Sequence, residues 1–158
     1  MINIVLARVD DRLIHGQIVN EWIASVNPTH LVVIDNELVN DKFMSNVYKA
    51  LLPIWLESCI LPENKAVEYL KNLDDKGVRI FIIARTSRVF EKLVAAGIAI
   101  KEITFADKMY FNNKIEIPEI DKKSMKNLLN FGVVLVAIHH PDDESQIIKE
   151  KIEDYDQG

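Results

Sequence analysis

The sequence has too little cysteine, no concentration of positive charge and no long apolar run, and each absence excludes a class of protein. Cys59 is the single cysteine, which excludes a disulfide framework and is typical of a reduced, cytoplasmic protein. No apolar run approaches the roughly 20 residues needed to cross a bilayer. A net charge of −5 argues against non-specific binding to nucleic acid, which needs clustered cations. We therefore expect a cytoplasmic globular protein with no nucleic-acid partner.

The motifs of the common cofactor sites are also missing. The chain has only 5 glycines, and they form neither a G-x-G-x-x-G nor a G-x-x-x-x-G-K-[ST] string. No pair of potential metal ligands has a characteristic spacing. The sequence therefore gives no support for a dinucleotide, a nucleoside triphosphate or zinc, and we expect neither a cofactor nor a metal.

Short apolar runs rich in β-branched residues alternate with amphipathic segments along the chain. Most of these runs are continuous, as in strands that are covered on both faces. The predicted strands are Ile2–Ala7, His30–Asp35, Val78–Ala84, Ile100–Ala106 and Gly132–Ile138, with a weaker candidate at Glu57–Leu61. The predicted helices begin near Gln17, Asn40 or Asp41, Pro62, Thr86, Asp121 and Pro141. The turn residues Asn112 and Asn113 predict a β-hairpin over Lys108–Ile117.

Strands alternating with helices predict a three-layer α/β fold: a doubly wound, mostly parallel sheet with helices on both faces and one small antiparallel hairpin. No linker or repeat interrupts the pattern, so residues 1–158 are predicted to form one domain. Ligands bind such sheets at the carboxyl ends of the strands. Ionisable residues follow most of the predicted strands there: Arg8 to His15, Asp35 and Glu37, Arg85 and Arg88, Asp107 and Lys108, and His139 with His140.

The loop after the first predicted strand is the most concentrated of these groups. Arg8, Asp10, Asp11, Arg12 and His15 lie within it, directly before a helix that begins around Gly16 or Gln17. Free amides at a helix start bind anions, and arginine forks fit phosphate oxygens. Asp10 or Asp11 could hold one ring nitrogen of His15 and leave the other as a nucleophile. This combination predicts a covalent phosphate carrier.

A structural role is the alternative for each of these residues taken singly. A histidine at a helix start is most often a surface or capping residue, and an Asp–Arg pair is most often a solvated ion pair. The density of ionisable residues in this loop favours a site. Elsewhere, Arg85, Thr86 and Ser87 could contact phosphate, although a helix cap is needed there in any case.

The string RVDDRLIHGQIVNEW, from Arg8 to Trp22, resembles the signature of the IIB components of the mannose family of the bacterial phosphoenolpyruvate-dependent sugar phosphotransferase system. The resemblance continues in HLVVIDNELVND and KLVAAGIAIKEI and extends over most of the chain. It implies a cytoplasmic α/β domain, associated peripherally with its membrane transporter, that takes a phosphoryl group from a IIA phosphohistidine onto His15. The group then passes to a sugar delivered by the IIC and IID membrane components.

The resemblance also implies roles for individual residues. Arg8 and Arg12 would stabilise the phosphoryl oxygens, and Asp10 would orient the imidazole of His15. Two segments depart from the family pattern: FADKM (Phe105–Met109), where a glycine-containing string is usual, and IHHPDD (Ile138–Asp143), where VPTD is common. The sugar stays open, as does a homo-oligomeric state.

Two other functions remain as alternatives. A degenerate relative would keep the fold as a binding or regulatory module without phosphoryl transfer, as the two altered segments allow. A receiver-like signalling domain would explain Asp10, Asp11, Thr86 and Lys108, but its phosphoacceptor aspartate should follow the third strand, where this chain has Leu61 and Pro62.

Overall fold

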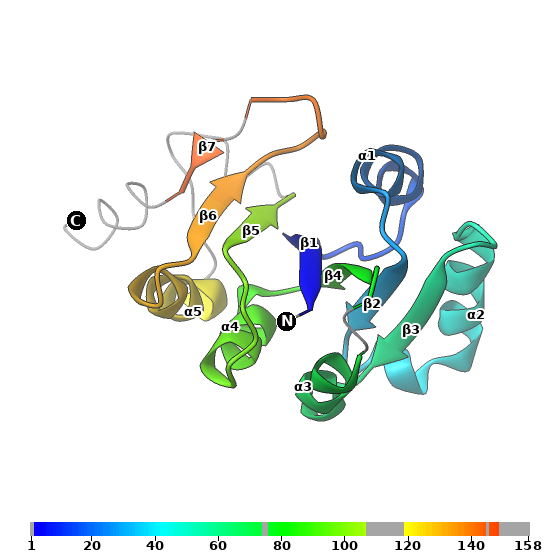
Figure 1. Ribbon diagram of the computed structural model, residues 1–158, viewed down its shortest axis with the longest axis horizontal. Coiled ribbons are helices and arrows are strands. Elements are labelled where there is room, and N and C mark those ends of the chain that lie inside the picture. Colours follow the sequence, from blue (N-terminus) through cyan, green and yellow to red (C-terminus); the bar gives the residue numbers. More distant parts are fainter. Residues whose placement is uncertain (1, 74–75, 107–118, 145, 149–158) are drawn as a thin grey trace.

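A parallel sheet runs through the part of the chain that the computed structural model describes, residues 2–73, 76–106, 119–144 and 146–148 (Figure 1). The strand order is β3-β2-β4-β1-β5-β6-β7. The first six strands pair in parallel, and β7 pairs antiparallel with β6. The strands are β1 (Asn3–Val9), β2 (His30–Ile34), β3 (Glu57–Leu61), β4 (Arg79–Ala84), β5 (Glu102–Phe105), β6 (Val134–Ala137) and β7 (Gln146–Ile147).

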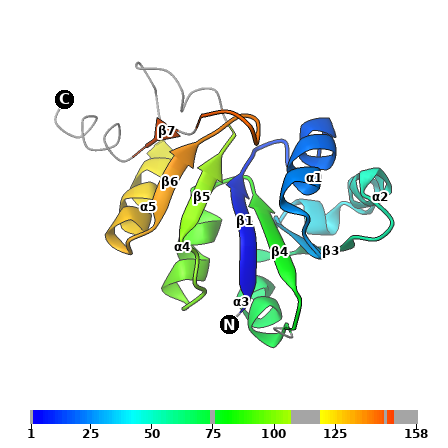
Figure 2. The same ribbon diagram turned by 45° about the horizontal axis from the view of Figure 1, so that its top comes forward.

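Helices cover both faces of this sheet, with α3, α4 and α5 on one side and α1 and α2 on the other (Figures 1 and 2). The helical elements are the π-helical η1 (Ile18–Trp22), α1 (Ile23–Val26), the 3-10 helix η2 (Leu38–Asn40), α2 (Lys42–Leu51), α3 (Glu63–Asn72), α4 (Ser87–Ala95) and α5 (Glu119–Asn130). Among the residues described, no helix combines the length and apolarity that a membrane span requires.

The strands are apolar on both faces because each face carries its own core. In β4, Ile80 and Ile82 pack into the core beneath α3, α4 and α5, whereas Phe81 and Ile83 pack into the core beneath η1 and α1. All four side chains are fully buried. Alternate side chains of the strand thus point into the two cores, and both sets are apolar, which is why the sequence shows no alternation of polar and apolar residues.

Helix α2 covers its face of the sheet only in part. Asp41 caps its first turn by accepting from the Met44 amide at 3.0 Å. Met44 and Tyr48 pack against the core, whereas Phe43 and Val47 on the next face of the helix are exposed. One side of this amphipathic helix therefore stays in contact with solvent.

The predicted α/β architecture is confirmed, including the weaker strand candidate at Glu57–Leu61. The helix predicted to begin at Pro141 is wrong over its described part: the chain turns there and Gln146–Ile147 pairs with β6 instead. An edge strand offers unpaired backbone groups, and β7 satisfies those of β6. The predicted hairpin over Lys108–Ile117 lies outside the described residues.

The topology places the end of β1 at the point where the connections diverge. The segment after β1 passes to the face of η1 and α1, whereas the connections after its neighbours β4 and β5 lead to α4 and α5 on the opposite face. Such a divergence opens a crevice at the carboxyl ends of the strands, where α/β proteins bind ligands. The loop after β1 lies at this end of the sheet.

Truncating Phe81 to alanine should lower the free energy of unfolding by about 3–5 kcal/mol, because it removes a fully buried ring and leaves a cavity. Urea unfolding followed by circular dichroism measures this change. Phe43→Ala is the matched control, because its ring is 76% exposed. The control should stay within about 0.5 kcal/mol of the wild type, and equal losses in the two variants would contradict the assignment of the core.

Candidate functional site

The loop after β1 is held in a tight, specific conformation. The Asp10 amide donates to the Ala84 carbonyl at 2.9 Å, which extends the pairing of β1 with β4, and the Leu13 amide donates back to the Asp10 carbonyl at 3.1 Å. Leu13 adopts a left-handed conformation with φ of 55°, which is uncommon for a bulky residue. Its fully buried side chain anchors this conformation in the core. The next turn brings His15 directly before the helix.

Asp10 and His15 meet in the centre of this loop. The Nε2 atom of His15 lies 2.7 Å from Oδ2 of Asp10. The His15 side chain is 17% exposed and that of Asp10 only 1%. Of the two aspartates left open by the sequence, Asp10 holds the ring, whereas Asp11 contributes its backbone carbonyl to Arg85. One ring nitrogen is thus engaged by a buried carboxylate, and Nδ1 is the nitrogen left for chemistry.

Arg12 closes the other side of the Asp10 carboxylate. Its backbone amide and Nε donate to Asp10 Oδ1 at 3.0 and 3.3 Å, and its Nη2 donates to Oδ2 at 3.4 Å. Burial alone would raise the pKa of Asp10, but the hydrogen bonds from His15 and Arg12 outweigh it and hold that pKa below its usual value. Asp10 is therefore an ionised acceptor, so Nε2 of His15 carries the proton. The Arg12 side chain remains 50% exposed.

Arg8 differs from the expectation that it faces the phosphate, because its side chain is fully buried. Its Nη1 donates to Thr104 Oγ1 at 3.2 Å, its Nη2 donates to the His139 carbonyl at 3.3 Å, and its guanidinium lies 4.1 Å from the centre of the Trp22 ring. Desolvation lowers the pKa of Arg8 to about 10, which leaves it charged at neutral pH. Arg8 thus ties β1 to β5 and to the end of β6.

The group after β4 is only partly available to a ligand. Arg85 donates from Nε to Asp35 at 3.1 Å and from Nη1 to the Asp11 carbonyl at 2.9 Å, so it braces the loop after β1. Thr86 is the N-cap residue of α4, but its side chain makes no capping hydrogen bond. Ser87, which was also predicted to contact phosphate, is fully buried, and its amide donates to the Asp121 carboxylate of α5. Asp121 thus occupies the position that an anion would take.

Gly16 and Gln17 open the helix beside His15. The His15 carbonyl accepts from the Val19 amide at 3.1 Å, so the first amides of the helix have no acceptor within it. A Cβ at Gly16 would lie 4.0 Å from Asn20 Nδ2, an ordinary van der Waals distance. Gln17 accepts from Arg12 Nη2 at 3.4 Å and donates to the His139 carbonyl at 2.8 Å.

Two residues at this site were not predicted from the sequence. Glu21 on η1 forms a 2.6 Å pair with Nδ1 of His140, and Trp22 lies against the guanidinium of Arg8. The predicted involvement of the segment after β6 rested on His139 and His140 alone. The four-residue spacing of Gln17 and Glu21 places both on one helix face, and this was the signal available in the sequence.

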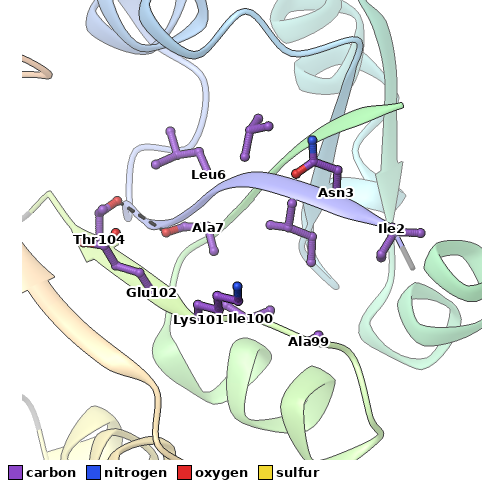
Figure 3. A pocket seen from close by; sticks show the side chains of 11 residues that line it. Ile2, Asn3, Leu6, Ala7, Ala99, Ile100, Lys101, Glu102 and Thr104 are labelled. Atoms are coloured by element: carbon purple, nitrogen blue, oxygen red, sulfur yellow. Dashed lines mark hydrogen bonds between the residues drawn. The ribbon is translucent and has the colours of Figure 1, made fainter. Parts of the chain in front are cut away.

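A hollow lies away from this loop, between β1 and β5. These strands pair only where Arg8 meets Thr104 and Val9 meets Phe105, and they diverge toward their amino ends. The resulting cleft of about 340 Å³ is closed at one end by the Thr104 hydroxyl, which donates to the Ala7 carbonyl at 3.3 Å (Figure 3). Ile2, Ile100 and Lys101 line it, and it contains none of the ionisable groups around His15.

A comparison with protein families assigns the chain. Residues 4–157 match the family described as PTS system sorbose subfamily IIB component. The chain belongs to this family. As a IIB component of the sugar phosphotransferase system, it is a sugar phosphotransferase domain.

Individual relatives agree with this IIB assignment. The chain is 26% identical to the fructose-specific EIIB component of Bacillus subtilis, over 92% of this chain and 93% of the relative. It is also 26% identical to the mannose-specific EIIAB component of Escherichia coli K12, over 82% of this chain but 42% of that longer protein. The IIBSor domain of the sorbose permease from Klebsiella pneumoniae has the same fold, with a TM-score of 0.86, 22% identity and coverage of 97% of this chain and 98% of that chain.

The site of this IIB component is suited to holding an anion. The half-exposed Arg12 guanidinium and the His15 ring bind the same Asp10 carboxylate, and the first amides of the helix follow His15 directly. Among the residues described, no group of three or more His, Cys, Asp or Glu side chains could hold a metal ion. What the arrangement offers chemically is a nucleophile, a fixed tautomer and positive charge.

Replacing Asp10 with asparagine should destabilise the fold at neutral pH by about 1–3 kcal/mol, because the charged acceptor of four donors is lost. The folded-state pKa of Asp10 lies below its unfolded value. Its stabilising contribution is therefore present above the unfolded value and is lost as the pH falls through the folded-state pKa. Urea unfolding between neutral pH and about pH 3 should show the two proteins converging in acid.

Asp11→Asn is the control for this experiment. Asp11 is exposed, and no described residue bonds its carboxylate. Its replacement should leave the pH dependence of unfolding unchanged. A difference between Asp10→Asn and the wild type that stays constant down to acid pH would show that the charge of Asp10 is not engaged.

Proposed function

We propose that this IIB component accepts a phosphoryl group on Nδ1 of His15 and passes it to a sugar during uptake. The single observation that carries the proposal is the 2.7 Å contact between His15 Nε2 and the buried, ionised Asp10. Because Asp10 only accepts, Nε2 holds the proton and Nδ1 keeps its lone pair for attack on phosphorus. The Nδ1–P bond forms as the donor's bond to phosphorus breaks.

Positive charge on the loop that carries His15 supports the transfer. Phosphoryl transfer depends chiefly on positioning and on stabilising the charge of the equatorial oxygens. Arg12 supplies a fork held by Asp10 and Gln17, and the amides from Gly16 onward supply donors at the positive end of the helix. Arg8 acts indirectly, by holding the end of β6 against the loop.

The family and the relatives support a proposal about the partners. In the mannose-specific relative, EIIA and EIIB are named as one component. We propose that a phosphorylated IIA domain is the donor for this chain, and that IIC and IID membrane components present the sugar. The chain would then work in the cytoplasm, in peripheral contact with that transporter. Relatives of equal identity are named for fructose and mannose, so the sugar is best found by assaying a panel.

Replacing His15 with alanine should abolish phosphorylation by a phosphorylated IIA donor, because the nucleophile is gone. Radiolabelled phosphate and mass mapping measure the modification. In the wild type the label should sit on His15, be lost in acid and survive alkali, as a P–N bond does. Circular dichroism should show that the variant remains folded.

His30→Asn is the control, because His30 opens β2 at the opposite end of the strands from His15. It should be labelled to the wild-type level. Label that persists in His15→Ala would move the acceptor elsewhere, with His139 and His140 the next candidates. A wild type that accepts no label from any IIA donor would favour a degenerate binding module.

Replacing Arg12 with alanine should slow phosphorylation of His15 on the order of 100-fold, the usual effect of losing one donor to a transition-state oxygen. Arg12→Lys keeps the charge without the planar fork and should fall between alanine and the wild type. Single-turnover quench-flow with the phosphorylated donor measures both rates. An alanine variant as fast as the wild type would exclude Arg12 from the phosphate site.

A further inference from the structure

The segment after β6 is fastened to the helix that follows His15. The carbonyl of His139 accepts from Gln17 Nε2 at 2.8 Å and from Arg8 Nη2 at 3.3 Å. One residue later, Nδ1 of His140 lies 2.6 Å from Glu21 Oε2. Two successive residues of this segment are therefore bonded to two residues on one face of the helix.

The His139 carbonyl determines which way the Gln17 amide points. A carbonyl oxygen only accepts, so the NH2 group of Gln17 must face it. The amide oxygen is then turned toward Arg12 Nη2, at 3.4 Å. Asp10 already holds the Nε edge of Arg12 at 3.3 Å. Gln17 thus gives this half-exposed guanidinium a second fixed partner on its outer edge.

His140 lies where it can strengthen or disturb this arrangement. Its Nδ1 is within hydrogen-bonding distance of both Glu21 Oε2, at 2.6 Å, and Gln17 Nε2, at 3.0 Å. One nitrogen cannot donate to the carboxylate and accept from the amide at the same time. While Nδ1 carries a proton it bonds Glu21, and the Gln17 amide is left to the His139 carbonyl. Without that proton, Nδ1 can only accept from the second hydrogen of the Gln17 amide, and the ion pair with Glu21 that binds this segment to the helix is lost.

The charged groups around His140 favour its protonated form. The hydrogen bond to Glu21 raises the pKa of His140 above its usual value, and Asp143 on the same segment also acts to raise it. Burial and the charge of Arg8 act against this shift. The same pair lowers the pKa of Glu21. The ring of His139 packs edge-on against that of His140, with 4.6 Å between the ring centres.

We propose that Gln17, His140 and Glu21 form a clamp that holds the Arg12 guanidinium in place on the Asp10 carboxylate that also binds His15, and that this clamp is closed when His140 is protonated. All three are positioning residues, since Arg12 is the group that would meet the phosphoryl oxygens. The proposal rests on the proposed function of His15. It assigns a role to His140, which lies in a segment that departs from the family pattern.

The direction of the pH effect follows from the ion pair. A histidine whose folded-state pKa is raised contributes most below its unfolded value, and its contribution is lost as the pH rises through the folded-state pKa. The clamp should therefore be closed near pH 6 and open above about pH 8. When the clamp opens, the Nη2 edge of Arg12 loses its fixed contact with Gln17, whereas the contact between Asp10 and His15 stays in place.

Gln17→Met tests the clamp directly, because methionine keeps the length of the side chain but makes no comparable hydrogen bond. Phosphorylation of His15 at pH 6 should slow on the order of tenfold at saturating donor, with the KM for the donor little changed. The control Asn20→Ala alters an exposed residue of the same helix and should transfer at the wild-type rate. A Gln17→Met variant as fast as the wild type would overturn the proposal.

His140→Asn tests the pH dependence. The ratio of the wild-type rate to the variant rate should be largest near pH 6 and approach one above pH 8, and this ratio cancels any pH effect that the two proteins share. A ratio that does not change with pH would overturn the role of the His140 proton.

An NMR titration separates this proposal from the proposed function, because it needs no phosphoryl donor. The Arg12 Nε–H signal should shift with the same midpoint as the His140 ring in the wild type and should lose that shift in Gln17→Met. Coincident midpoints support the clamp, and an Arg12 signal indifferent to His140 overturns it. A failure of the wild type to be labelled at His15 would overturn the proposed function alone.

Discussion

The buried carboxylate of Asp10 is the constraint on which the rest of the site depends. It is nearly free of solvent, and ionised carboxylates are stable in such a place only when donors surround them. His15 and Arg12 supply those donors, and the Asp10 amide fastens the same residue to β4. The ring orientation of His15, the place of Arg12 and the path of the loop are therefore consequences of satisfying one charge.

The sheet topology determines where this carboxylate lies. The connection after β1 leads to one face of the sheet, and those after its neighbours β4 and β5 lead to the other face. No described helix therefore covers the carboxyl end of β1, whereas helices cover both faces of the sheet. Arg8 spans the interior from β1 to β5 and to the end of β6, with the Trp22 ring against its guanidinium. Through Arg8, the segment that carries His140 is held close to the loop that carries His15.

The local sequence pattern predicted most of the fold, and it failed where contacts between residues distant in the sequence determine the structure. Runs such as Val78–Ala84 are apolar on both faces, which is sufficient to predict buried parallel strands. The residues after Pro141 have a helical pattern, yet Gln146 and Ile147 pair with the open edge of β6. Ser87 was predicted as a phosphate contact from its place after a strand. Its burial against Asp121 depends on how α5 packs on α4, which no local pattern carries.

The sequence by itself determined that a histidine, an aspartate and an arginine share one loop between a strand and a helix, because residues so close in the chain meet through local backbone geometry. Tertiary structure decided which aspartate holds the ring, and it buried Arg8 while leaving Arg12 half-exposed. It also brought the His139 carbonyl to Gln17 across 122 positions of sequence. Burial and long-range hydrogen bonds depend on which strands become neighbours, and that is a property of the assembled sheet.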